Sequence, residues 1–261
     1  HGCVVSADGM ETRTVNSLVS VTKTEAVADF DRRRLLLLEW FATSARDLPW
    51  RLTRDPWAVL VSETMLQQTQ VTRVVPRYLE FLQRFPTPMA CADSSPGDVV
   101  RMWAGLGYNR RALQLHAAAT AVCRQHGGLL PNDLDALMGL PGIGPYTARA
   151  VLTFAYERDD VGVLDTNAAR VLARAFAGRK LGKADAQRLA DSLTPKDAGW
   201  AWNQAVLDVG ALYCRARSPE CPTCPLVNDC AWRKSGSDID PAAGSAGVSK
   251  RQPAFNGSNT Q

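Results

Sequence analysis

Four cysteines near the C-terminal end constrain how this chain can fold more than any other feature of its sequence. Cys214, Cys221, Cys224 and Cys230 have the spacing C-x6-C-x2-C-x5-C and fall within seventeen residues. Loops this short cost little entropy when they close around one centre, and thiolates bind metals strongly. The spacing therefore predicts a metal site made by these four side chains.

Two disulfides or a zinc ion are the alternatives for this cysteine set. Disulfides are disfavoured, because the start of the chain has no basic and apolar pattern of a secretion signal. Zinc ribbons favour paired C-x2-C knuckles on both sides, whereas only Cys221 and Cys224 are paired in this way. An all-thiolate set fits a [4Fe–4S] cluster better. We expect an iron–sulfur cluster as the cofactor, with zinc as the alternative.

The rest of the chain has the pattern of an all-α protein. Asp55 and Pro56 form an N-cap with a proline at the first helical position, and apolar residues follow at helical spacing. Further helices, separated by glycine and proline breakers, are expected over 75–85, 96–103, 110–126, 133–138, 147–154, 166–176, 184–193 and 200–212. Alternating strand patterns are absent. No apolar run reaches the roughly 18 residues that a membrane span needs.

Composition divides the chain into a core and two flanking segments. Hydrophobic residues make up 46% and charged residues 21%, which is typical of a globular protein and excludes global disorder. Residues 1–29 show little periodicity and are expected to be a disordered leader, and residues 235–261 a disordered tail. The folded core is expected over 30–234. The net charge of +4 is compatible with a polyanionic partner but does not require one.

A glycine-rich turn between two helical stretches is the first sign of what that partner is. The segment Leu-Pro-Gly-Ile-Gly-Pro-Tyr-Thr begins at Leu140. Gly142 and Gly144 are expected to give the turn conformations closed to other residues, leaving bare N–H groups that suit a phosphate oxygen. Leu140 and Ile143 are expected to point inward, with Thr147 as a cap. This is the helix-hairpin-helix pattern, a sequence-independent grip on the DNA backbone.

These features together resemble a known family. The hairpin, the segment Val-Leu-Asp-Thr-Asn at 163–167 and the cysteine spacing are similar to those of the helix-hairpin-helix base-excision DNA glycosylases, the endonuclease III superfamily. Leu-Pro-Trp-Arg at 48–51 and Ser-Glu-Thr-Met-Leu-Gln-Gln-Thr-Gln at 62–70 resemble the adenine DNA glycosylases of the MutY type. The resemblance covers roughly residues 35–233.

The resemblance implies a fold and a division of the core. Two helical subdomains are expected, with a cleft between them and a C-terminal iron–sulfur cluster loop. The six-helix subdomain is expected over about 56–163. The cluster subdomain is expected to combine about 30–55 with 164–234.

The resemblance also implies catalytic roles for four residues. Glu63 matches the general acid that protonates the base, and it needs a pKa raised by burial. Asp165 matches the second carboxylate, which stabilises the developing positive charge and is kept ionised by Asn167 and by the start of the following helix. Tyr146 stands where bifunctional members carry a nucleophilic lysine. We therefore expect a monofunctional enzyme without strong lyase activity at abasic sites.

Each of these residues has a simpler interpretation when it is taken alone. Glu63 would be a solvated surface charge on an amphipathic helix, since it lies off the apolar stripe. Asp165 would be an N-cap, and Tyr146 an ordinary core or interface aromatic. Their combination, in this order and with these neighbours, favours the catalytic interpretation.

Further residues match positions that touch DNA in the family. Gln68 matches a polar wedge that fills the gap left by an extruded base. Tyr108 belongs to a loop whose aromatics enter the base stack, although Asn109 replaces a second aromatic that is common there. Arg51 and the hairpin residues Gly142, Gly144 and Thr147 complete the expected DNA-binding set.

The expected function is hydrolysis of the glycosidic bond of adenine mispaired with 8-oxoguanine or guanine. Only a Ser/Gly-rich segment follows the cysteines, so the chain is expected to lack the C-terminal domain that recognises 8-oxoguanine. One alternative is a minimal mismatch glycosylase that removes thymine or another base. Another is a non-catalytic iron–sulfur DNA-binding protein. We expect a monomer that binds double-stranded DNA, not membranes, in the cytoplasm at the nucleoid.

Overall fold

The computed structural model describes residues 11–243. Within this range the regular secondary structure is all helical, as predicted. The elements are α1 (Glu11–Ser44), η1 (Pro49–Arg51), α2 (Pro56–Leu66), α3 (Val71–Arg84), α4 (Pro88–Ala92), α5 (Pro96–Met102), α6 (Arg110–His126), α7 (Leu134–Met138), α8 (Pro145–Phe154), α9 (Thr166–Val171), the π-helical turn η2 (Leu172–Ala177), α10 (Lys183–Leu193), α11 (Gly199–Leu212), η3 (Cys221–Thr223) and α12 (Ala231–Ser235). No described helix has the length and apolar character that crossing a bilayer requires.

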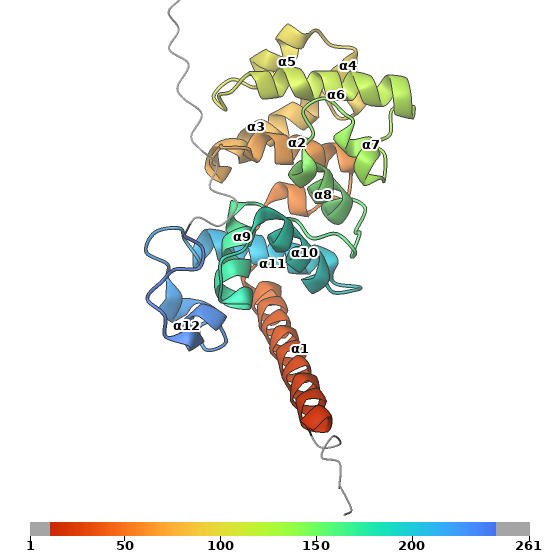
Figure 1. The fold of residues 1–261 in the computed structure, drawn as a ribbon. Coiled ribbons are helices and arrows are strands. Elements are labelled where there is room, and N and C mark those ends of the chain that lie inside the picture. Colours follow the sequence, from red (N-terminus) through yellow and green to blue (C-terminus); the bar gives the residue numbers. More distant parts are fainter. Residues whose placement is uncertain (1–10, 244–261) are drawn as a thin grey trace, which may run out of the picture.

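The helices form two groups, each with its own hydrophobic core (Figure 1). Helices α2 to α8 surround the first core, in which the rings of Phe81 and Trp103 meet edge to face. Helices α1 and α9 to α11 surround the second core, where Phe176 packs against Trp202 in the same way. The chain therefore crosses between the groups twice, once before α2 and once between α8 and α9.

The first crossing lies earlier in the chain than the sequence predicted. Residues 30–55 were expected to belong wholly to the cluster subdomain. Instead Leu48 and Trp50 are buried in the first core, where the Trp50 ring packs edge to face on Tyr78. The next helix begins as expected, because the Asp55 side chain accepts a hydrogen bond from the Trp57 N–H at 3.1 Å.

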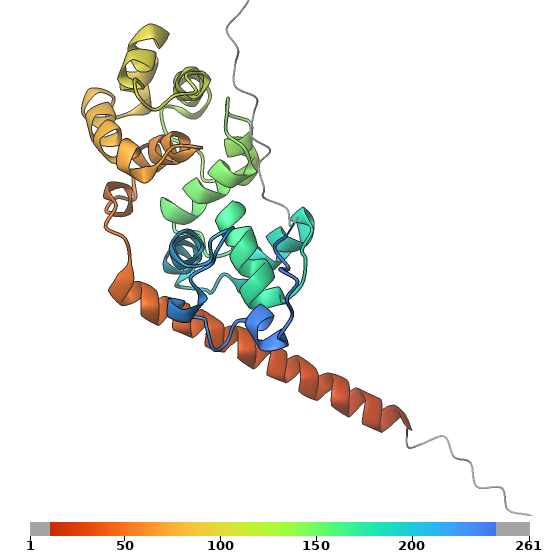
Figure 2. The ribbon, with the colours of Figure 1, turned by 90° about the vertical axis from the view of Figure 1, so that its left-hand side faces the viewer.

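Part of the segment 1–29, which was expected to be a disordered leader, belongs to the first helix. Residues 1–10 lie outside the described residues, whereas α1 already begins at Glu11 and extends well beyond the helical body (Figure 2). The sequence of α1 contains neither glycine nor proline, so nothing in it breaks the helix. Missing apolar periodicity led to the expectation of disorder over residues 1–29, whereas the structure has a helical backbone from Glu11 onward.

The disordered tail was expected to begin at residue 235, but residues 235–243 are part of the described structure. Asp240 accepts two hydrogen bonds from the buried Arg174 guanidinium, at 2.8 and 2.5 Å. The same guanidinium lies 5.2 Å from the ring centroid of Trp232. Residues 235–243 are thus attached to the second helical group by a charge pair that sequence spacing could not reveal. The rest of the expected tail, 244–261, lies outside the described residues.

Candidate active site

Glu63 lies on α2, and its side chain is buried with only 5% of the residue exposed. Its Oε2 atom has no hydrogen-bond partner. Burial raises the pKa of Glu63 to about 7, and the negative charge of Asp165 adds to this, while a hydrogen bond from Tyr146 and the charge of Arg51 act in the opposite direction. A solvated surface position is excluded, because α2 is buried on almost every side. Near neutral pH this carboxyl group can hold a proton and release it.

Tyr146 lies in the first turn of α8 and donates its hydroxyl hydrogen bond to the Glu63 carboxylate. Helix α8 packs directly on α2, which brings the two side chains together. Burial and the negative charges of Glu63 and Asp165 hold the pKa of Tyr146 well above its usual value. The phenol therefore stays protonated and acts as a hydrogen-bond donor.

We predict that Tyr146→Phe moves the loss of activity in alkaline solution to higher pH. The substitution removes a hydrogen bond that favours the ionised carboxylate, so the pKa of Glu63 should rise above about 7, by about one pH unit. The pH dependence of base excision in single turnover measures this shift. A shift toward lower pH would contradict the assigned contact.

Asp165 ends the second crossing between the helical groups and is the N-cap of α9. Its Oδ1 accepts from the Ala168 N–H at 2.7 Å, and its Oδ2 accepts from the Asn167 side-chain amide at 3.0 Å. Burial nevertheless raises the pKa of Asp165, although these donors and the charge of Arg170 oppose the rise. The donors that were expected to keep Asp165 ionised, Asn167 and the start of α9, are in place, and each lowers the pKa that burial raises. Both oxygens remain hydrogen-bonded, which favours the carboxylate more than at Glu63.

The three groups meet where the two helical groups face each other. Glu63 and Tyr146 come from the first group, and Asp165 comes from the second. The charge of Asp165 acts on both of the other side chains. A simple N-cap and an unrelated surface glutamate would not share this electrostatic environment. The arrangement places a proton donor and a carboxylate within electrostatic reach of each other.

Arg51, which was expected to bind DNA, is held by a buried ion pair. Its side chain is buried and donates to both carboxylate oxygens of Asp208, at 2.8 and 2.9 Å. Asp208 lies on α11 and is fully buried, and Arg46 donates to it as well, at 2.6 Å. Arg51 thus links the two helical groups through a buried ion pair, which no local sequence pattern predicts.

The hairpin before α8 agrees with only part of the sequence analysis. Leu140 and Ile143 are buried, as expected. Gly142 has φ +75°, and a Cβ at this position would lie 2.6 Å from the Cβ of Gln114, so glycine is required. Gly144 has an ordinary negative φ and free space around it. Thr147 is buried, and α8 has no side-chain cap, so its expected role as a cap is wrong, whereas its expected contact with DNA stays a prediction.

The two glycines provide a matched pair of substitutions. Gly142→Ala should lower the free energy of unfolding by about 2 kcal/mol, because it combines a left-handed backbone with a steric clash. Gly144→Ala should change it by less than about 0.5 kcal/mol. Denaturant titration of both variants checks the difference, and equal effects would contradict this description of the turn.

Two of the expected DNA-contacting side chains lie on one face. Gln68 follows α2, is exposed and has φ +57°, while Tyr108 precedes α6, is 54% exposed and has φ +49°. Both line the same surface pocket, together with Asn109 and Arg73. A left-handed backbone is unfavourable for residues with side chains, and such residues cluster at functional sites.

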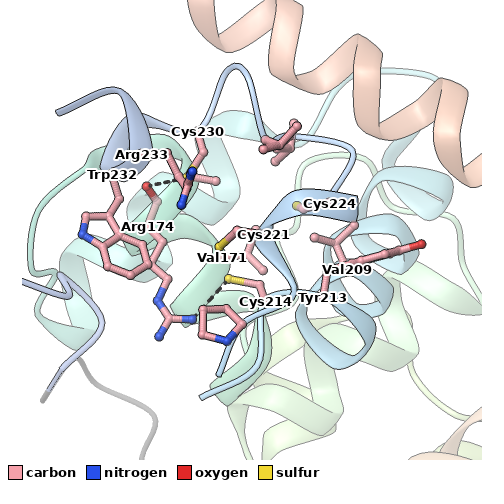
Figure 3. A pocket seen from close by; sticks show the side chains of 14 residues that line it. Val171, Arg174, Val209, Tyr213, Cys214, Cys221, Cys224, Cys230, Trp232 and Arg233 are labelled. Atoms are coloured by element: carbon pink, nitrogen blue, oxygen red, sulfur yellow. Dashed lines mark hydrogen bonds between the residues drawn. The ribbon is translucent and has the colours of Figure 1, made fainter. Parts of the chain in front are cut away.

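The four cysteines of the C-terminal loop line a common cavity (Figure 3). All four are free and half-buried, so disulfides among them are absent in this part of the chain. Arg174 donates a hydrogen bond to the Cys214 sulfur at 3.5 Å, and Leu226 is among the apolar residues that line the cavity. Within the described residues, no group of three or more His, Cys, Asp or Glu side chains has the arrangement that a single metal ion requires. Four converging thiols, an apolar wall and a cationic neighbour are a donor set that fits an iron–sulfur cluster.

A chain of hydrogen bonds connects this loop with the candidate catalytic carboxylate. Arg170 donates to the backbone oxygen of Cys214 at 2.5 Å and to the Asn167 side-chain oxygen at 2.7 Å. Asn167 in turn donates to Asp165. The folded state of the cysteine loop therefore helps to hold the side chain that positions Asp165.

Sequence reasoning missed one further residue of this region. Gln204 on α11 is only 5% exposed, yet its side chain makes no hydrogen bond to the described residues. It lies one helical turn before Asp208, which binds Arg51. Arg51 also keeps a buried Nε without a partner. Unpaired buried donors and acceptors are rare, but glutamine and arginine give no sequence signal that distinguishes them from surface residues.

Comparisons with known proteins agree with this geometry. Residues 61–196, which include Glu63, Tyr146 and Asp165, match the family of HhH-GPD superfamily base excision DNA repair proteins. The adenine DNA glycosylase of Mycobacterium tuberculosis is 45% identical over 219 residues, covering 80% of this chain and 71% of that protein. The thymine/uracil-DNA glycosylase of Pyrobaculum aerophilum is 37% identical over 210 residues, covering 77% and 91%. The solved structure of a thermostable thymine-DNA glycosylase superposes with a TM-score of 0.75 at 29% identity, covering 80% and 98%.

Proposed function

Because this chain belongs to the HhH-GPD superfamily of base excision DNA repair proteins, we propose that it hydrolyses the N-glycosidic bond of adenine in duplex DNA. The observation that carries the proposal is the buried Glu63 with a pKa near 7, facing Asp165. Identity of 45% to an adenine DNA glycosylase supports adenine as the excised base. A purely DNA-binding protein has no use for two buried carboxyl groups placed together.

Glu63 and Asp165 divide the chemistry between them. Adenine is a poor leaving group, so its departure needs protonation, which Glu63 supplies. The resemblance to the adenine glycosylases indicates adenine N7 as the acceptor. As the bond breaks, the sugar gains positive charge, and the Asp165 carboxylate stabilises it. Water then completes the hydrolysis, and an abasic site remains.

The second half of the proposal is that cleavage stops at the abasic site. A lyase reaction through a Schiff base needs a nucleophilic amine. Tyr146 occupies the hairpin position where bifunctional relatives carry lysine. The nearest lysines that follow in the sequence, Lys180 and Lys183, are exposed and lie on the far side of α9 in the chain. Hydrolysis without strand cleavage is the expected outcome.

Base recognition needs polar groups that are free to bind. Glu63 Oε2 and Arg51 Nε are buried without partners, and the nearby Gln204 side chain is also free of hydrogen bonds to the described residues. An adenine has both hydrogen-bond donors and acceptors along its edges. Binding it would therefore give these unpaired groups hydrogen-bond partners. Arg51 would thus act inside the base pocket, and not on the DNA backbone.

The remaining DNA contacts come from the exposed face. Gln68 and Tyr108 would enter the duplex when the adenine is extruded, since an extruded base leaves a gap in the stack. The hairpin N–H groups around Gly142 and Gly144 would bind a backbone phosphate. We infer 8-oxoguanine or guanine as the opposite base, a monomeric enzyme, and a cytoplasmic location at the nucleoid.

The proposed cofactor is a [4Fe–4S] cluster held by Cys214, Cys221, Cys224 and Cys230. A four-iron cluster separates its thiolate ligands more widely than one zinc ion does, which accords with four thiols that line a cavity without a single-ion arrangement. When bound, the cluster would supply a rigid loop and electron-transfer chemistry. A loop held in this way would also hold Arg170, which donates to the Cys214 backbone oxygen and to the Asn167 side chain.

A second candidate function is removal of thymine from a mismatch. The 37% identical relative is named a thymine/uracil-DNA glycosylase, and a thymine-DNA glycosylase has a similar structure. The 45% identical relative is named an adenine DNA glycosylase, which favours the first candidate.

A panel of mismatched duplexes tests both candidates. Adenine and thymine are each placed opposite guanine and 8-oxoguanine, and products are analysed with and without alkaline cleavage. The proposal predicts loss of adenine, with strand breaks only after alkali. Loss of thymine alone would favour the second candidate, and breaks without alkali would contradict the monofunctional assignment. Duplexes that all stay intact would reject catalysis.

A further inference from the structure

Arg111, at the start of α6, has a buried guanidinium whose partners are almost all backbone oxygens. Its Nη1 donates to the carbonyl oxygens of Thr64, Met65 and Gln67 at 2.9, 3.0 and 2.6 Å, and its Nη2 donates to Thr69 Oγ1 and to the carbonyl oxygens of Leu106 and Gly107 at 3.0, 3.1 and 3.0 Å. No carboxylate of residues 11–243 forms an ion pair with it. One side chain therefore connects two chain segments about forty residues apart.

The two connected segments are the ones that carry the exposed wedge side chains. The first is the end of α2 and the turn after it, where helical carbonyls lack backbone partners. Gln68 lies in this turn between two residues whose oxygen atoms bind Arg111. The second is the loop 105–108, which ends at Tyr108. The guanidinium carbon also lies 5.6 Å from the Tyr108 ring centroid.

Both wedge residues have left-handed backbones, which cost energy unless their surroundings enforce them. Arg111 supplies such surroundings, because it donates to the Gln67 carbonyl and the Thr69 hydroxyl on either side of Gln68, and to the carbonyl of the residue immediately before Tyr108. A planar guanidinium with donors in a rigid fork can bind both segments at a fixed separation. A lysine ammonium has three donors at one point and cannot reach both sets with the same geometry.

We propose that Arg111 is a positioning residue that fixes the spacing between Gln68 and Tyr108, so that both enter the DNA stack together. The proposal rests on the proposed glycosylase function, whose base-extrusion step it explains. Without the Arg111 guanidinium, each segment would move independently. Gln68 and Tyr108 would then fill the gap left by the extruded base less completely. Replacing Arg111 should therefore slow the extrusion of a paired adenine and leave the rate of bond cleavage unchanged.

Two variants of the full-length protein test this inference. Arg111→Lys keeps a positive charge but loses the fork. Thr69→Val is the milder change, and it removes a hydroxyl that accepts from Arg111 and also donates to the Leu106 carbonyl oxygen at 3.3 Å. Arg188→Lys is the matched control, since Arg188 is an exposed arginine on α10 with a surface ion pair to Asp185. Hydrogen exchange of residues 66–70 and 104–109 is measured without DNA. Excision is measured on adenine paired with 8-oxoguanine and on adenine opposite an abasic site, where extrusion costs little.

For Arg111→Lys we expect exchange in both segments to rise about ten-fold. Excision from the paired duplex should fall about 100-fold, and from the unpaired adenine by no more than about three-fold. Thr69→Val should shift both measurements in the same direction by less, and Arg188→Lys should leave them unchanged. A loss of excision that is equal on both substrates would assign Arg111 a merely structural role and overturn the proposal.

Exchange that rises in only one segment, or in neither, would also overturn it. If Arg111→Lys fails to fold, Thr69→Val decides alone by the same criteria. Failure of the proposed function is distinguishable, because wild-type protein would then excise adenine from neither substrate. The exchange measurement would still report whether Arg111 holds the two segments together.

Discussion

Glu63→Gln lowers the single-turnover rate of adenine excision by about 10³-fold, because glutamine keeps the shape of the side chain but cannot donate an acidic proton. General acids in enzymes contribute roughly 10²–10⁴ to the rate. Quenched single-turnover assays with excess protein measure this loss directly. Glu39→Gln is the matched control, since Glu39 is an exposed carboxylate on α1, and it should retain the wild-type rate. Equal rates for Glu63→Gln and wild type would remove Glu63 from the acid role.

The same substitution should stabilise the folded protein in alkaline solution. The pKa of Glu63 is raised from 4.5 to about 7 on folding, so the folded state binds the proton more tightly than the unfolded chain. Wild-type stability from this group is fully present below pH 4.5 and is lost as the pH rises through about 7. Glutamine avoids this loss, so its advantage should grow to roughly 3 kcal/mol well above pH 7. Urea titrations at pH 5 and pH 8.5 check the difference.

Asp208→Asn should lower the free energy of unfolding by about 3–5 kcal/mol at neutral pH. The substitution breaks a buried ion pair and leaves the Arg51 guanidinium without its counter-charge between the two helical groups. Burial alone would raise the pKa of Asp208, but Arg51 and Arg46 outweigh it, so the net pKa lies below its ordinary value. The stabilisation is therefore present above the unfolded pKa and is lost as the pH falls through the folded one. Chemical denaturation at several pH values measures it.

An exposed pair provides the control for this prediction. Asp185 and Arg188 form a surface ion pair on α10, and Asp185→Asn should change stability by less than about 0.5 kcal/mol. Loss of similar size in both variants would contradict the special role of Asp208. The unpaired Arg51 charge in Asp208→Asn should also lower the pKa of Glu63, which moves the alkaline loss of activity to lower pH.

Local patterns predicted much of the fold because its helices have local causes. The N-cap at Asp55 and the buried Leu140 and Ile143 follow from residue type and spacing. The beginning of α1 at Glu11 was missed, because the segment lacks an apolar stripe although it also lacks helix breakers. Short elements such as α4 were missed as well, since five residues carry too little periodicity to detect.

The candidate site was predictable where the chemistry depends on residue identity within a motif. Glu63, Tyr146 and Asp165 were expected to act together, and the structure places them in one electrostatic environment. The errors fall on residues whose role depends on distant partners. Arg51 was expected to bind DNA, but its pairing with Asp208, far away in sequence, could not be foreseen: Asp208 accepts hydrogen bonds from both Nη atoms of Arg51. Burial of this kind is a property of the packed structure and leaves no mark on local spacing.

The pH dependence of adenine excision by the wild-type protein, measured in single turnover below saturation, tests the central claim most directly. Below saturation the profile reports the groups of the free enzyme. If burial between Tyr146 and Asp165 gives Glu63 a pKa of about 7, the rate falls ten-fold per pH unit above that value. A rate that stays constant or increases between pH 6 and pH 9 would show that no proton from Glu63 is required.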